Sequence, residues 1–144
     1  MRRRLPGGDV EVGRHTADLE LVFRAGTLRE LFAAAARGML DYIVPSPARG
    51  RRVRKLLRVE APQREDLLVT WLNELLYRLE VESVKFDRCR FLLFSSRRLE
   101  ARVEGAVVDL ARRGSGVEIK AATYHGLSLF RTASFWEARV IFDL

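Results

Sequence analysis

Hydrophobic and polar positions change their repeat several times along the chain, and each repeat predicts a different kind of element. Leu19–Phe23 alternates at period two, which is typical of a strand. From Leu28 onward the apolar positions recur every three or four residues, which predicts a helix reaching about Tyr42. Thr27 and Glu30 have the spacing of a capping box and mark its start. Pro45 prevents its continuation.

A second helix is indicated by a broader apolar stripe. Pro62 stands where this helix should begin, and Glu65 and Asp66 in the first turn would complement the helix dipole. We expect this face to belong to the hydrophobic core rather than to a cofactor site. Its apolar members are Leu67, Leu68, Trp71, Leu72, Leu75, Leu76 and Leu79.

The remaining segments favour strands. Leu99, Ala101 and Val103 alternate with charged residues, so that strand should have one face in water. The other expected strands are Val10–Val12, Val53–Glu60, Phe86–Phe94, Val117–Ala121 and Trp136–Phe142. This order predicts an α+β fold: one mostly antiparallel β-sheet system with two packed α-helices, in a single domain over 1–144.

The composition is that of a globular protein, with 48% hydrophobic and 31% charged residues. No apolar run approaches the length needed to span a membrane, so we expect no membrane partner. The basic start has no apolar segment after it, so no signal peptide is expected. Cys89 is the only cysteine, and a lone thiol fits a cytoplasmic location.

The chain is basic, with 26 lysines and arginines against 19 acidic residues and a net charge of +7. Such a balance can reflect contact with a polyanion, although we favour an arginine-rich soluble surface as its cause. The densest basic run is Arg49–Lys55, which has no interleaved aromatic residues to stack on bases. Any contact there would be with phosphates and would not be specific.

The clearest candidate site is an oxygen cluster at the two ends of the chain. Asp143 precedes Leu144, the last residue, so its side chain lies beside the free carboxylate of Leu144. A hard divalent cation favours clustered oxygens of this kind. If the fold brings Asp18 to the same place, these groups make a small metal site. Lys120 would neutralise nearby carboxylates if its strand neighbours the last one.

Enzymatic chemistry has less support. The only histidines are His15 and His125, and neither lies in a nucleophile-elbow motif. A zinc site would lack a second cysteine. A metal-dependent hydrolase using Asp18, His15 and His125 stays as an alternative with a thin set of ligands.

Several segments together resemble the archease family over nearly the whole length. They are His15-Thr16-Ala17-Asp18, the Leu28–Met39 helix, the segment Trp71-Leu72-Asn73-Glu74-Leu75-Leu76, the block from Lys120 to Leu127, and Trp136 to Leu144. Each is weak alone, but their common order and spacing are specific.

The resemblance implies a function. Archeases are small cytoplasmic proteins that activate the RtcB-type RNA ligase of tRNA splicing and RNA repair. They promote the ligase–GMP intermediate and multiple turnover, and they are not themselves the enzyme. The family's metal, typically calcium, would be held here by Asp18, Asp143 and Leu144. We expect His15, Lys120 and His125 to line the same edge as partner contacts.

This chain departs from the family in its charge, because many archeases are strongly acidic. The basic run Arg49–Lys55 therefore leaves a second hypothesis open, a basic RNA-binding or chaperone-like module that delivers tRNA.

Overall fold

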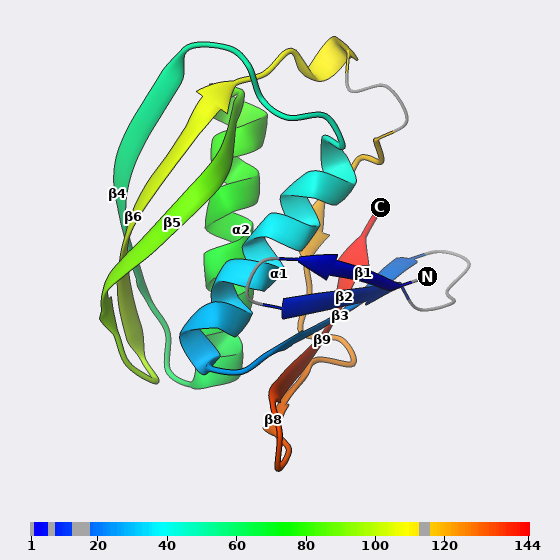
Figure 1. The fold of residues 1–144 in the computed structure, drawn as a ribbon, viewed down its shortest axis with the longest axis vertical. Coiled ribbons are helices and arrows are strands. Elements are labelled where there is room, and N and C mark those ends of the chain that lie inside the picture. The colour runs from blue at the N-terminus through cyan, green and yellow to red at the C-terminus, as the bar shows by residue number, and fades with distance from the viewer. Residues whose placement is uncertain (1, 6–7, 13–17, 113–115) are drawn as a thin grey trace.

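The fold has three layers, with two helices packed between two antiparallel sheets (Figure 1). The computed structural model describes residues 2–5, 8–12, 18–112 and 116–144. The α+β class and the two packed helices are confirmed, and the expected sheet system is resolved into two separate sheets. In the described part of the chain, neither helix is long and apolar enough to cross a membrane.

The larger sheet contains both the early strands and the last strand of the chain. Its hydrogen-bonded order is β1-β2-β3-β9-β7, and β8 also pairs with β9. All of these pairings are antiparallel. The strands are β1 (Arg2–Leu5), β2 (Gly8–Val12), β3 (Asp18–Ala25), β7 (Ala121–Ala122), β8 (Ser128–Arg131) and β9 (Trp136–Asp143).

The smaller sheet has the order β4-β6-β5, comprising β4 (Arg52–Glu60), β5 (Val84–Phe94) and β6 (Arg98–Val107). Its inner face packs on the helices through residues such as Leu57, Leu99 and Val103. A turn around Ser95 joins β5 to β6, and the Ser95 amide donates to the Arg98 carbonyl at 2.8 Å. The opposite face of this sheet is turned to solvent.

The middle layer consists of α1 (Leu28–Ile43) and α2 (Arg64–Glu82). The predicted cap of α1 is present, because the Glu30 amide donates to the Thr27 hydroxyl at 3.2 Å. The apolar stripe of α2 is buried as expected, and the indole of Trp71 donates to the Phe32 carbonyl on α1 at 3.1 Å. The start of α2 was predicted two residues too early, at Pro62. The helix begins at Arg64, with Gln63 as its N-cap.

Two predictions about strands were wrong or incomplete. The alternation at Val117–Ala121 forms a strand only at Ala121–Ala122, because only that end reaches β9. Strands β1 and β8 were not predicted. The β8 sequence, Ser128-Leu129-Phe130-Arg131, is too short to show a period.

Candidate functional site

The two aspartates predicted to meet are direct neighbours in the larger sheet. Asp18 is the first residue of β3 and pairs with Asp143, near the end of β9. Residues paired across antiparallel strands have their side chains on the same face, with Cβ atoms roughly 5 Å apart. The adjacent Leu19 and Phe142 are buried in the core, so both aspartates face away from the helices. The fold thus brings Asp18 and Asp143 together, as the metal hypothesis requires.

Lys120 also lies at this edge. Its amide donates to the Asp143 carbonyl at 2.8 Å, just before β7 pairs with β9. The condition set for Lys120, a position beside the last strand, is therefore met. Its side chain is exposed, and it makes no ion pair with the described residues. Leu144 follows Asp143 at the end of β9 and is 42% exposed.

His125 lies in the turn after β7, and this turn is fastened to the end of β9. The Thr123 amide and hydroxyl both donate to the Ile141 carbonyl, at 3.0 and 2.8 Å. Gly126 has a positive φ of 63° and lies so close to the Ile141 side chain that a Cβ would be only 2.8 Å away. His125 itself is exposed. His15 lies outside the described residues.

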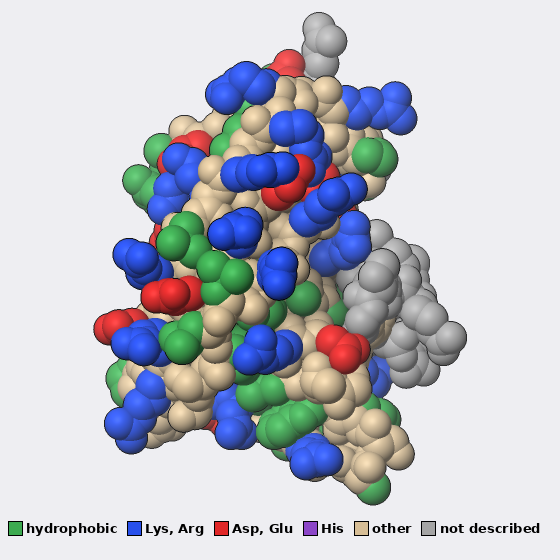
Figure 2. Space-filling view, turned by 60° about the vertical axis from the view of Figure 1, so that its left-hand side comes forward, with side chains coloured by type: hydrophobic (Ala, Val, Ile, Leu, Met, Phe, Trp, Pro, Cys, Tyr) green, Lys and Arg blue, Asp and Glu red, His purple; other side chains and the backbone are tan. Residues whose placement is uncertain are grey.

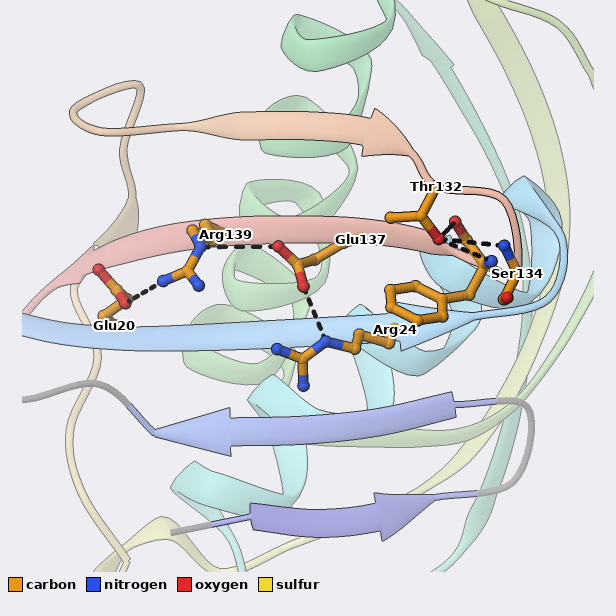
Figure 3. A network of polar contacts seen from close by, with 7 residues as sticks. Glu20, Arg24, Thr132, Ser134, Glu137 and Arg139 are labelled. Carbon is orange, nitrogen blue, oxygen red and sulfur yellow. Dashed lines mark hydrogen bonds and ion pairs between the residues drawn. The ribbon is translucent and has the colours of Figure 1, made fainter.

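The outward face of β3 and β9 carries two further acids, Glu20 and Glu137, that the site prediction did not include. Glu20 lies two positions after Asp18 and therefore on the same face. Arg139 donates to Glu20 at 3.0 Å and lies 3.7 Å from Glu137, which accepts a 2.7 Å hydrogen bond from Arg24 (Figure 3). The period-two pattern that predicts the strand could have shown that Glu20 shares the face of Asp18.

These contacts leave a local charge imbalance at the end of the two strands. Glu20 and Glu137 have arginine partners, whereas within the described ranges no cation lies in ion-pair range of Asp18 or Asp143. Like charges directly opposite each other destabilise a sheet. A divalent cation would relieve that repulsion, and carboxylate oxygens are the ligands that Ca²⁺ or Mg²⁺ prefers.

The pair alone is a sparse metal site. The described residues contain no group of three or more His, Cys, Asp or Glu side chains placed to hold a metal. Any cation bound here would need further oxygens, and the adjoining Leu144 carboxylate and water are suitable donors. This donor set fits a hard cation and does not fit zinc, which favours sulfur and nitrogen ligands.

Comparison with known proteins decides the family. Residues 11–144 match the sequence model of the Archease protein family (MTH1598/TM1083). The chain belongs to the archease family. An archease of Methanosarcina acetivorans is 32% identical, and the alignment covers 96% of this chain and 97% of that one. An archease of Pyrobaculum calidifontis is 30% identical over 92% of each chain.

Solved structures agree with this archease fold. Protein 1598 of Methanobacterium thermoautotrophicum superimposes with a TM-score of 0.66 at 25% identity, over 94% of this chain and 98% of that one. A Thermotoga maritima archease, described as a possible chaperone, gives a TM-score of 0.65 at 22% identity, over 92% and 94%. The resemblance noted from the signature segments is thereby confirmed.

The basic run of this archease is divided between a loop and a strand. Arg49–Arg51 belongs to the connection between α1 and β4, whereas Arg52 begins β4. Arg52 donates to Asp87 at 2.8 and 2.9 Å and to Glu104 at 3.1 Å. The hydrogen bonds from Arg52 to Asp87 hold the pKa of the Asp87 carboxyl below its usual range. The run predicted as a tRNA contact is thus divided between a loop and a strand that already has acidic partners.

The Cys89 thiol is not activated as a nucleophile in this archease. It is half-buried on β5, where desolvation raises its pKa to about 12. Since the thiolate is the reactive form, the folded protein should react with iodoacetamide at pH 8 far more slowly than the protein in denaturant. Mass spectrometry of timed samples would measure this. Equal rates in the two states would contradict the protection that burial is expected to give.

Proposed function

We propose that this chain is a non-catalytic activator of an RtcB-type RNA ligase and that Asp18 and Asp143 form its working tip. The observation that carries the proposal is that Asp18 and Asp143 are direct cross-strand partners at an exposed end of the sheet. No cation among the described residues forms an ion pair with either of them. Membership in the archease family supports the choice of partner.

In this proposal the tip holds one divalent cation, with calcium as the leading candidate. Asp18, Asp143 and the Leu144 carboxylate would supply protein oxygens, and the bound ion would offset the repulsion between the aspartates. Glu20 is not proposed as a ligand of the cation, because its carboxylate accepts a hydrogen bond from Arg139 at 3.0 Å. The tip would approach the ligase active site and organise metal or nucleotide while the ligase–GMP bond forms.

Lys120 and His125 are proposed as partner contacts at the same edge. Both are exposed, and both lie on the segment that is hydrogen-bonded to the end of β9. This gives the ligase a rigid surface around the tip, because β7 and its turn are joined to β9 by backbone hydrogen bonds. We propose a cytoplasmic location for the complex.

A non-catalytic role is supported by the state of the nucleophilic candidates. The Cys89 thiol stays protonated at neutral pH because burial raises its pKa to about 12. His125 lies in an exposed turn, and among the described residues no carboxylate is in ion-pair range to orient it. Both features disfavour nucleophilic catalysis by these side chains.

Guanylylation of the cognate ligase tests the proposal. With GTP in a single-turnover assay, Asp18→Asn and Asp143→Asn should each lower the stimulation by at least about tenfold, because metal sites lose that much even when only supporting groups are removed. The variants should also lose the calcium-dependent rise in stability, which would be about 2.7 kcal/mol at a hundred times the dissociation constant.

Glu60→Gln provides the matched control, since Glu60 is an exposed carboxylate on the other sheet. It should stimulate the ligase as the unaltered chain does. Full stimulation by both aspartate variants would rule out the tip. If the aspartate variants lost stimulation but still bound calcium, the aspartates would remain contacts with the ligase. Their role as calcium ligands would be ruled out.

A further inference from the structure

The solvent-facing side of the smaller sheet is rich in arginine. We call it the arginine face. Figure 2 shows Lys and Arg side chains spread over this side of the molecule, with few acidic ones between them. Strand alternation and cross-strand pairing place its basic residues on one surface. They are Arg52, Arg54 and Arg58 on β4, Arg88 and Arg90 on β5, and Arg98 and Arg102 on β6.

The acidic residues of this face are engaged mainly with β4. Glu104 lies 3.1 Å from Arg52 and 3.5 Å from Arg54. Glu100 lies 3.3 Å from Arg58. The β4 edge is therefore largely neutralised, and the positive charge that is left lies towards β5 and β6.

Two arginines face each other at the centre of this region. Arg90 on β5 is paired directly with Arg102 on β6, and both are exposed. Within the described part of the chain, neither guanidinium makes an ion pair or a side-chain hydrogen bond. Like charges in such a pair reduce the stability of a sheet, and an anion held between them would reverse that effect.

The surface around this pair is shaped to receive such an anion. Two shallow hollows open here, and Arg54 and Arg102 line both of them. One hollow is completed by Arg88, Arg90, Cys89 and Glu104, the last of which is engaged by Arg52 and Arg54, and the other by Lys55 and Leu56. Alternate residues on a strand are about 6.6 Å apart, so the face presents a regular array of donors rather than a single anion pocket.

We propose that the arginine face binds the phosphate backbone of RNA, with Arg90 and Arg102 as its central contacts. The guanidinium fork matches phosphate oxygens, and within the described ranges neither of these two forks forms an ion pair with an acidic side chain. Exposed aromatic side chains that could stack on bases are not present among the outward residues of β4, β5 and β6, so binding is independent of base sequence.

Protein and DNA partners fit this face less well. The centre of a protein interface is normally depleted of unpaired charge, whereas here two guanidinium groups without an acidic partner lie between Leu56 and Leu92. A-form RNA has a wide, shallow minor groove that the surface of a sheet can approach. B-form DNA is entered by a protruding helix or ribbon. The choice of RNA also rests on the proposed function, while the phosphate contacts do not.

Fluorescence anisotropy with a labelled RNA hairpin tests the assignment. The double variant Arg90→Gln/Arg102→Gln should weaken RNA binding at least about tenfold at 0.1 M salt and lower the salt slope by about 2. Its melting temperature should not fall, because the change removes a repulsion. Ligase guanylylation without RNA should be unchanged, which separates this proposal from the aspartate tip.

The matched control is Arg49→Gln/Arg131→Gln, which removes the same charge from exposed positions off this face. It should bind RNA nearly as the unaltered chain does. An equal loss in the control would show that overall charge binds RNA and would overturn the assignment. It would also be overturned if a DNA hairpin, polyglutamate or phosphatidylserine vesicles bound as tightly as the RNA, or if no RNA bound at low salt.

Discussion

Gly105→Val should lower the free energy of unfolding by about 3 kcal/mol or more, the upper part of the range for overpacked sites. Gly105 lies in β6 opposite Phe86, beside a register shift in β5. A Cβ at this position would be 2.0 Å from the Lys85 carbonyl oxygen and 2.6 Å from the Phe86 Cα. Both are backbone atoms, so no side chain can rotate away to make room.

Chemical denaturation monitored by circular dichroism would measure this loss. Gly26→Ala is the control, because a Cβ there meets nothing within 4 Å. Alanine at such an open position should be neutral or stabilise by up to about 1 kcal/mol through the unfolded state. A Gly105 variant as stable as the control would show that β5 can shift to admit a side chain, contrary to the contacts described.

The elements that the sequence predicted well are those whose signals are local. The Thr27–Glu30 cap and the apolar spacing after it are contained within α1, and the α2 stripe is likewise contained within one helix. Which strands pair depends on distant contacts. The alternation of Leu99–Val103 shows that one face is wet, but it does not show that β6 lies between β4 and β5. The separation into two sheets could not be deduced from periodicity.

The same distinction applies to the candidate site. Asp18 and Asp143 were expected to meet only on the condition that the termini converge, and the register of β3 with β9 fulfils it. The arginine pair could not be foreseen. Arg90 and Arg102 are separated by a turn and a bulged pairing, and the register shift between Phe91 and Leu93 helps to set which residues are opposite. The basic run Arg49–Lys55 indicated only the β4 arginines of this face, Arg52 and Arg54.

The two proposed surfaces share one physical feature. Each centres on a pair of like charges held opposite each other by backbone pairing, Asp18 with Asp143 and Arg90 with Arg102. Each pair reduces the stability of the free protein, so a ligand of opposite charge binds with the added benefit of relieving repulsion. The pairs lie in different sheets, on either side of the helix layer, so a cation and a polyanion can bind at the same time.

Lys85 makes the buried polar contacts that join β5 to the end of α1. Its side chain is buried, and Nζ donates to the Val44 carbonyl at 2.7 Å and the Ser46 carbonyl at 3.2 Å. Nζ also lies 2.8 Å from the Asp41 carboxylate. The last turn of α1 has no basic residue of its own. Lys85 therefore satisfies the carbonyl end of the helix dipole from a distant strand.

Lys85→Met should accordingly destabilise the fold by about 3 kcal/mol, because it keeps the volume but leaves two carbonyls and a carboxylate without their donor. The melting temperature should fall by roughly 10 °C. Lys55→Met, at an exposed lysine on β4, should change stability by no more than about 0.5 kcal/mol. If both variants melted at the same temperature, water would be replacing the ammonium group at the end of α1, and the link between α1 and β5 would rest on apolar packing alone.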